Sequence, residues 1–500
     1  MPAKIRRSKV LVSRPSPRSD LSLADRQGAK ATLSEFFAVW HANREAMLEI
    51  DRWQRNELDD EQKPVMPEEA TDEFRRLRDT AIGGYGRLVV STLVQNALVE
   101  DIRLRDTKQS APASRLWQRN GMDARQVPLV TAAATYGQSF NLVLPATGRL
   151  DGEPTAVFMG YSGLRGVGFY ADPAHDEYPE FFLEGEPYFD KAEGARRWRM
   201  QLVNDYACYY FTAADDGSDI RTVDGNGGRR HDMGLTPVVR YVNEIDLEGR
   251  VTGEIAPIIT TLARIDQDTQ DRLVVQRFGA WVVRTIAGMK KPTSEADQAA
   301  ARIALGVGSF LVSEDADTKF GHIPATPLQG HLSAHDTDLR DLAALSQTPS
   351  HHLLGASDNL GADGLAAAEA THMRKADIRK LGWGESHENS VRLGGQAMGD
   401  DEIANDFESR VHWRQTRSEA FQSLAQAIGT LVAAGVPLEL LVTRISDWTQ
   451  ADTQMMKDLA AQQDAKDRLR AEEDSARQIE AQVKVARAKE AEGGNAPAAR

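Results

Sequence analysis

Apolar residues recur at helical spacing in the first part of the chain and at strand-like intervals after it. The pattern predicts helices over 32–56, 71–100 and 114–135. Short apolar and aromatic runs punctuated by Gly, Pro and Asp follow, which predict strands over 140–144, 156–161, 167–171, 181–183, 206–212 and 237–242. The sequence therefore predicts a mixed α+β body.

Residues 253–278 form a second kind of pattern, a long helix with apolar ends and a polar middle. Pro257 falls in its first turn, where a missing N–H costs nothing. The middle contains no apolar residue, and a helix that is polar all round does not cross an ordinary core. We expect it to cross solvent, a channel or a polar seam between subunits through Asp266, Asp268, Gln270, Asp271 and Arg272.

A compact insertion is predicted next, over 281–334. Its expected parts are a strand at 281–286, a turn with Lys290 and Lys291, a helix at 295–304 and a strand at 309–313. The elements expected after the insertion are a helix over 337–346, a Gly- and Asp-rich loop over 355–363, and a long helix over 364–393 with a kink at Gly382 and Gly384.

The two ends of the chain differ in character. Residues 1–30 are basic and lack periodicity, so we expect a poorly ordered arm. Near the other end, Thr416 and Glu419 form a capping-box pattern that opens a helix, and Gly435 ends it. Another helix is predicted to start at 449–452; beyond 465 it is charged on every face, and 493–500 are expected to be disordered.

Composition narrows the class of protein without deciding it. The chain has 74 acidic and 60 basic side chains, a formal charge of −14, and 41% hydrophobic residues. A protein that grips DNA needs a basic contact face, so an acidic chain either avoids nucleic acid or lets it slide. The first twenty or so residues contain no apolar run that would suggest a signal peptide, no stretch approaches the roughly 20 apolar residues of a membrane span, and Cys208 is the only cysteine. A cytosolic setting is expected.

The sequence offers few candidates for chemistry. It contains no Gly-Lys dipeptide, which excludes a Walker A phosphate loop, and it lacks the His-Glu-x-x-His and Gly-x-Ser-x-Gly motifs. Gly306 and Gly308 are explained by a turn before a strand. We therefore expect no enzyme activity and no cofactor.

Histidines are the strongest candidates for a metal site. His351 and His352 are adjacent, and His322, His331 and His335 precede them. Neighbouring residues on a regular element point apart, and no carboxylate or cysteine lies at ligand spacing, so loop or interface histidines are expected instead. Glu369 and His372 resemble half of a di-iron motif, but a second copy is absent.

Three other features have simple structural interpretations. Cys208 lies in an aromatic run and is expected to be a buried strand residue. The pairs Arg196-Arg197 and Arg229-Arg230 are expected to be solvated loop charges, and Lys290-Lys291 a turn that could meet a partner or phosphates.

Several stretches, in register over about 35–450, are similar to the portal proteins of tailed phages, particularly the siphophage branch. They are 85–96, 116–123 with 134–137, 170–173, 233–243, and 345–355 running into 365–369. The order of the expected elements also resembles that of the portal family. One stretch departs: the helix after the loop usually opens with a sequence close to Ser-Gly-Glu-Ala, whereas here it is Asp-Gly-Leu-Ala at 363–366.

The resemblance implies a portal fold and a place in the virion. The implied parts are a flexible arm (1–30), α/β wing (31–252), stem helix (253–280), small α/β clip (281–334), second stem helix (335–350), tunnel loop (351–363), kinked wing helix (364–410), helical crown (411–465) and charged tail (466–500). A ring of typically twelve subunits at one capsid vertex is implied, assembled in the host cytoplasm. The implied partners are double-stranded DNA, the major capsid protein, scaffold, terminase and head–tail adaptor, with no membrane.

The tunnel loop is the part expected to face DNA, through Ser357, Asp358, Asn359, Leu360 and Asp363. It has no Lys or Arg, so it would favour sliding or steric gating over phosphate gripping. Our hypothesis is that Asn359 and Leu360 touch DNA sterically. The clip tip, with Lys290 and Lys291, is the other candidate contact.

Alternatives remain open at this point. Another ring protein of the head–tail junction is possible, although such proteins are usually shorter and lack the order helix, insertion, helix, loop. A nuclease or maturation protease fused to a structural domain is disfavoured because no acidic residues cluster. A coiled-coil scaffold fits 450–490 but not the β-rich middle.

Overall fold

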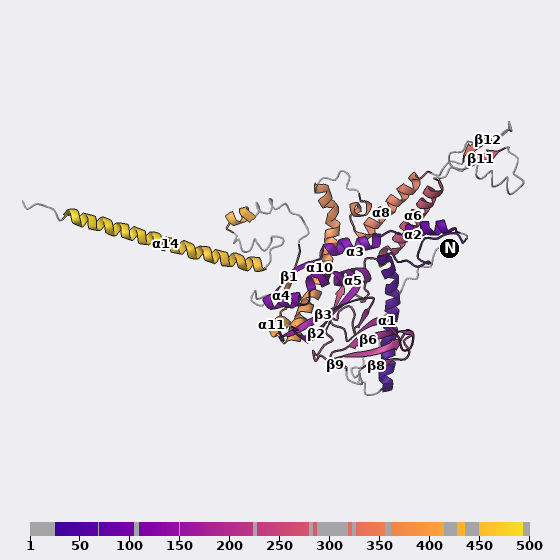
Figure 1. Cartoon of the computed structure of the whole chain (residues 1–500), viewed down its shortest axis with the longest axis horizontal. Helices are drawn as coiled ribbons and strands as arrows, with labels where there is room; N and C mark the ends of the chain where they lie inside the picture. Colours follow the sequence, from indigo (N-terminus) through magenta and orange to yellow (C-terminus); the bar gives the residue numbers. More distant parts are fainter. Residues whose placement is uncertain are drawn as a thin grey trace, which may run out of the picture. The chain divides into compact units, whose positions relative to one another are not determined.

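The computed structural model describes residues 26–68, 70–104, 110–149, 151–223, 228–279, 284–287, 319–322, 327–355, 362–414, 428–435 and 450–493. The chain divides into two compact units, residues 1–411 and 412–500. The first unit combines helices with several sheets, which confirms the α+β prediction (Figure 1). Among the described helices, none is both long enough and apolar enough for a membrane crossing.

The larger sheet carries helix α1 (Arg26–Arg55) on one face. Its described strands are in the order β4-β5-β6-β7-β8, with β9 also paired to β7. Phe36 and Trp40 of α1 pack against Trp198 and Met200 of the sheet, and the two indole rings lie 4.9 Å apart. The strands are β4 (Gly166–Phe169), β5 (Phe181–Asp190), β6 (Ala195–Val203), β7 (Ala207–Ala214), β8 (Arg221–Thr222) and β9 (Arg229–Arg230).

A smaller antiparallel sheet packs on the other face. Its order is β10-β2-β3, formed by β10 (Val238–Val242), β2 (Gln138–Thr147) and β3 (Pro154–Ser162). Because successive side chains point to opposite faces, Phe140 and Leu142 pack against Phe182 of the larger sheet. Ser139 and Asn141 face the other way and bond to helices α5 (Met122–Tyr136) and α10 (Ala362–Met398). This body is thus built of four layers: α1, two sheets, and the α5–α10 pair.

Two expected helices are each divided in the structure. The pattern over 71–100 gives α2 (Asp72–Thr80), α3 (Tyr85–Gln95) and the start of β1 (Val99–Arg103), because Gly83 and Gly84 separate the two helices. The pattern over 114–135 gives α4 (Ser110–Arg119) and α5, which are separated by Gly121 with a φ of 59°. Single long helices were therefore wrong at both places.

The prediction for Arg196-Arg197 was also wrong. Both residues lie on β6, a strand that the sequence analysis did not predict. Arg197 is 2% exposed, and its guanidinium contacts Glu193 at 3.1 Å and Asp219 at 2.9 Å. Arg229 and Arg230 lie on the short strand β9 rather than in a loop, although both are exposed. Cys208 is a buried residue of β7, as expected.

The expected long helix begins as a 3₁₀ turn, η1 (Ala256–Ile258), and continues as α6 (Ile259–Gly279). Helix α8 (Gln329–Ser346) lies beside it (Figure 1). Because α8 begins at Gln329 rather than near 337, the expected end of the insertion at 334 falls inside this helix. Of the insertion, the structure describes β11 (Arg284–Ala287) and β12 (Lys319–His322), which pair in antiparallel fashion. The elements expected at 295–304 and 309–313 lie outside the described residues.

The expected loop over 351–363 is partly helical. Helix α9 (Ser350–Leu354) ends at Gly355, whose φ of 65° suits glycine, and α10 starts at Ala362. Residues 355–361 separate the two helices. Helix α10 continues through Gly382 and Gly384 to Met398, five residues beyond the expected end. Helix α11 (Asp401–Ala404) follows it, and the first unit ends within β13 (Arg410–Trp413).

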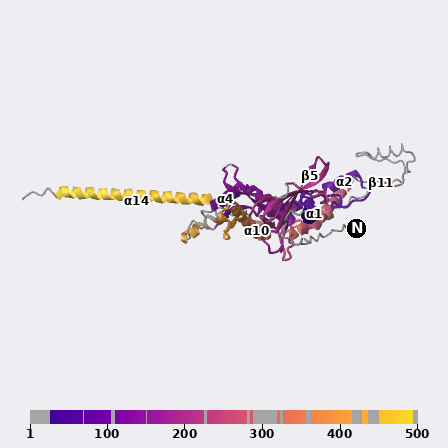
Figure 2. The same ribbon diagram turned by 90° about the horizontal axis from the view of Figure 1, so that it is seen from below.

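The described part of the second unit is mainly helical. Residues 428–433 are helical, and the helix stops near Gly435, whose φ is 89°, at the glycine where the sequence predicted its end. The capping-box residues Thr416 and Glu419 lie outside the described residues. Helix α14 (Gln450–Gly493) is one unbroken helix (Figure 2). Its described side chains beyond 465 are exposed, in agreement with a helix that is charged on every face.

Candidate functional site

The polar middle of α6 is covered on one side by the chain itself. The backbone N–H of Gly83 donates to Asp266 Oδ1 over 2.9 Å, and the N–H of Val65 donates to Gln267 Oε1 over 2.8 Å. Asp266 and Gln270 are buried as a result. Burial raises the pKa of Asp266 to about 7, against the opposing effect of the Gly83 N–H. These two residues therefore do not face solvent within one chain.

Charged contacts join the other side of α6 to α8. Arg264 reaches Asp338 at 2.8 Å and Asp341 at 2.9 Å. Asp268 lies between His331 at 3.7 Å and His335 at 4.0 Å. Ion pairs of an exposed side chain such as Arg264 contribute little stability singly, so packing of α6 on α8 is the main constraint.

The remaining predicted stem residues are more accessible. Asp271 is exposed and accepts a hydrogen bond from Gln267 over 3.2 Å, and Arg272 is half-buried. Whether these side chains border a channel or a neighbouring subunit stays a prediction. The sequence predicted that the middle of α6 does not cross an apolar core. The structure shows that this part of the helix is instead buried by polar contacts with the segment between α1 and α3.

A buried ion cluster fixes the base of α6 to α10. Lys375 donates to Glu254, which lies two residues before η1, and also to the backbone oxygen of Ser346 over 2.7 Å. Arg379 contacts the same Glu254 at 3.3 Å and Glu244 at 2.8 Å. Because breaking a buried pair leaves a charge without compensation, this cluster holds three elements in one geometry.

The predicted DNA-channel residues are mostly beyond the described part of the chain. Ser357, Asp358, Asn359 and Leu360, and the clip-tip residues Lys290 and Lys291, lie outside it. Asp363 lies in the first turn of α10. The structure brings the two flanks of this segment together, however, through side chains that the sequence analysis had set aside.

The expectation that the adjacent His351 and His352 point apart, with no carboxylate near them, was wrong. Both Nε2 atoms lie on Glu369 Oε1, at 3.0 Å for His351 and 2.8 Å for His352. The adjacent rings converge, with centroids 4.4 Å apart. The carboxylate comes from α10, so sequence spacing gave no sign of it. Among the described residues, this is the group of histidines and carboxylates close enough to share a metal ion.

His372, the second residue of the Glu369-x-x-His372 pattern, makes a different contact. Its Nδ1 lies 3.1 Å from the backbone oxygen of Gln347, and the ring is 1% exposed. His372 therefore joins α10 to the end of α8. Among the described histidines, His322 lies on β12.

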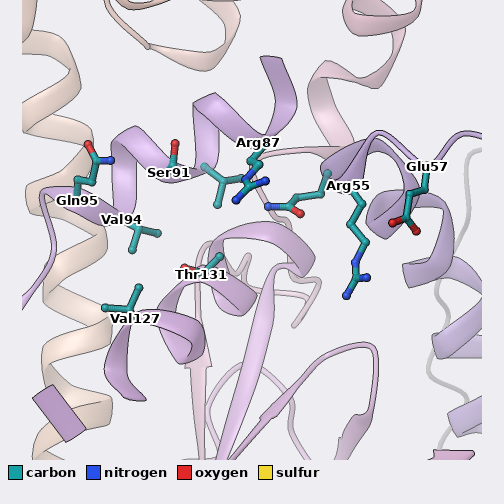
Figure 3. A pocket seen from close by; sticks show the side chains of 10 residues that line it. Arg55, Glu57, Arg87, Ser91, Val94, Gln95, Val127 and Thr131 are labelled. Atoms are coloured by element: carbon teal, nitrogen blue, oxygen red, sulfur yellow. The ribbon is translucent and has the colours of Figure 1, made fainter. Parts of the chain in front are cut away.

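A pocket of about 510 Å³ lies between the end of α1, α3 and α5. Figure 3 shows Val94 of α3 and Val127 and Thr131 of α5 lining it from neighbouring helices. Arg55 also lines it but pairs with Asp51 at 3.2 Å. Its ten lining residues include Ser91 but no histidine, and the Ser91 hydroxyl donates to the oxygen of Leu88 over 3.0 Å. The pocket therefore lacks an activated nucleophile.

Comparisons with known proteins agree with this architecture. The sequence model of the family described as "Phage portal protein, SPP1 Gp6-like" matches residues 35–469. The chain therefore belongs to this family of phage portal proteins, which are structural rather than enzymatic. The match spans both units and every element from α1 into α14.

The portal protein of Mycobacterium phage L5 is 24% identical over 374 residues, which cover 70% of this chain and 72% of that protein. The portal protein of Mycobacterium phage D29 is 23% identical over 367 residues, covering 70% and 73%. A chain of a solved structure, described as the neck of a native GTA particle computed with C12 symmetry, is 11% identical. It covers 79% of this chain and 95% of its own, with a TM-score of 0.42.

Proposed function

We propose that the chain forms the portal ring of a tailed-phage capsid, a channel at one vertex through which double-stranded DNA enters and leaves. The observation that carries this proposal is the family match over residues 35–469, which includes the paired helices α6 and α8. Twelve subunits would form the ring, and a closed ring gives every subunit the same two neighbours.

Within this proposal, α6 and α8 are the stem and the four-layer body is the wing. Residues 281–328 would form the clip, 355–361 the tunnel loop, 411–465 the crown and 466–500 the tail. The exposed Asp271 and the half-buried Arg272 would lie at the channel or the seam between subunits. Asp266 and Gln270 would instead stabilise the subunit, since their own chain covers them.

The chain would guide and gate DNA, whereas a separate terminase ATPase would move it. The major capsid protein and scaffold would surround the ring during assembly in the host cytoplasm, and the head–tail adaptor would dock afterwards. No enzymatic activity is proposed, because the sequence lacks a phosphate loop and the pocket lacks a nucleophile with a base.

Electron microscopy of the purified full chain tests the proposal. Negative-stain images should show rings with a central hole, and mass measurement should give about twelve chain masses, as the resemblance implies. A population of monomers or rods under conditions that favour assembly would contradict it. A ring lacking the long paired helices in cryo-EM maps would favour another junction protein.

A further inference from the structure

We propose that His351, His352 and Glu369 bind a divalent transition-metal ion, with zinc as the best match. The three side chains offer two imidazole nitrogens and one carboxylate oxygen, all within 4.8 Å of one another. This inference stands on the geometry of α9 and α10 and does not depend on ring formation.

The donor set selects the class of ion. Imidazole nitrogen favours zinc, copper, nickel or cobalt, whereas magnesium and calcium prefer oxygen ligands alone. Zinc with two histidines and one glutamate is a known arrangement that leaves a fourth position for water. The accessibility of His352 and Glu369, whose side chains are 32% and 28% exposed, leaves room for that water.

The spacing of the donor atoms is close to that of a bound site. Both Nε2 atoms lie 2.8–3.0 Å from one carboxylate oxygen. In a tetrahedral zinc site with bonds of about 2.0–2.1 Å, neighbouring ligand atoms are roughly 3.3 Å apart. The two nitrogen-to-oxygen spacings would therefore have to widen by only about half an ångström to admit the ion, and the two nitrogens already lie within 4.8 Å of each other.

Rigid elements hold all three ligands in place. Helix α9 follows Pro349, is anchored by buried Leu353, and ends at Gly355 in the left-handed region. On α10, His372 lies three residues after Glu369 and fixes this turn to the oxygen of Gln347. Ligands on supported helices bind metal better than ligands on loops, because less order is lost on binding.

Zinc here would clamp α9 to the first turns of α10. It would therefore join the two ends of the segment 355–361, which we propose as the tunnel loop.

Titration of zinc into the untagged, EDTA-treated full chain tests the site, by calorimetry or by competition with a fluorescent indicator. One equivalent per chain should bind. The double variant His351→Gln with His352→Gln, and the single variant Glu369→Gln, should each weaken zinc binding by at least roughly tenfold. Loss of a residue that only hydrogen-bonds to a metal ligand already costs about this much, and a ligand should cost more. Millimolar magnesium should not compete.

A second histidine pair provides the matched control. His331 and His335 flank Asp268 at the longer distances of 3.7 and 4.0 Å, so His331→Gln with His335→Gln should leave the zinc affinity unchanged. Loss of the bound equivalent in this control, or no difference for the His351 and His352 variant, would refute the proposed site. Absence of saturable binding to the wild-type chain would refute it as well.

Two spectroscopic measurements separate binding from misfolding. Cobalt in place of zinc should give visible absorption bands in the wild type and in the control but not in Glu369→Gln, while circular dichroism stays the same for all three. Hydrogen exchange of residues 350–354 should slow on zinc addition only where the site is intact. A monomeric chain that still shows these signals would contradict the ring and leave the metal site standing.

Discussion

Lys375 of α10 donates a hydrogen bond to Glu254, 121 residues earlier in the chain, and both side chains are buried. The pair joins the chain just before α6 to the helix that covers the smaller sheet. A displacement of α6 would therefore reach the four-layer body through this pair.

Replacing Lys375 with Met should destabilise the first unit by roughly 3 kcal/mol, because Glu254 would keep only Arg379 as a cation partner. Urea unfolding measures the change. Lys380→Met on the same helix is the control, since Lys380 pairs with exposed Asp377 and should shift the free energy by less than about 1 kcal/mol. If both variants changed the free energy of unfolding equally, the buried pair would contribute no more stability than the exposed one.

Asp266 predicts a pH dependence of stability. Its folded pKa of about 7 is above the ordinary value of 3.8, so the folded state holds a proton that the unfolded state releases between these values. The stabilisation is complete below pH 4 and is lost as the pH rises to about 7. At about 1.4 kcal/mol per pKa unit, the loss is up to roughly 4 kcal/mol.

Asp266→Asn should therefore flatten the decline in Tm between pH 4.5 and 7.5, because the amide oxygen still accepts from Gly83 and no longer ionises. Scanning fluorimetry across this range is sufficient. Asp271→Asn, at an exposed site one turn further on, should retain the wild-type profile. If Asp266→Asn also retained it, another group would be responsible for the dependence.

Gly137 predicts a steric cost. Its φ is 90°, and a Cβ there would lie 3.1 Å from backbone atoms of Thr252 and Gly253. Gly137→Ala should cost about 2–3 kcal/mol from strain and displaced backbone. Gly152→Ala is the matched control: its φ of 71° gives similar strain, but nothing lies within 4 Å. Thermal unfolding that separates the two variants by less than about 0.5 kcal/mol would assign the whole cost to φ.

Charge reversal tests the tunnel-loop hypothesis. Asp358→Lys with Asp363→Lys should slow DNA packaging or ejection, and the effect should weaken as salt rises, because new cations would grip phosphates. An in vitro packaging assay at two salt concentrations measures this. The double variant Asp358→Asn with Asp363→Asn is the control, because it changes the same two residues without introducing a positive charge. Unchanged packaging by the lysine variant would remove the loop from the mechanism.

The sequence revealed the elements whose periodicity is undisturbed. Helix α1 and the long helix α6 were predicted because apolar residues fall at regular spacing or because no Gly interrupts the run. Strand β6 was missed although Trp198, Met200 and Leu202 alternate along it. The strand was missed because Arg197 was interpreted as a solvated charge. Its guanidinium is in fact buried and paired with Glu193 and Asp219, which sequence spacing does not reveal.

The candidate sites depended on contacts between distant segments. Periodicity showed that the middle of α6 avoids an apolar core, but not that Gly83 and Val65 supply its partners. His351 and His352 were dismissed for lack of a nearby carboxylate, and Glu369 lies 17 residues beyond His352. Such convergence is a property of the fold and is not encoded in local spacing.

Helix α10 has 37 residues, and at 1.5 Å per residue it is about 55 Å long. His372 and Lys375 fasten it near one end, while His387 and Ser390 lie 3.0 Å from Tyr241 in the smaller sheet. Because these two attachments lie about four helical turns apart, α10 cannot rotate about its axis or slide along it independently of the body. In the proposed portal, any force that DNA applied to the start of α10 would therefore move this helix and the four-layer body together.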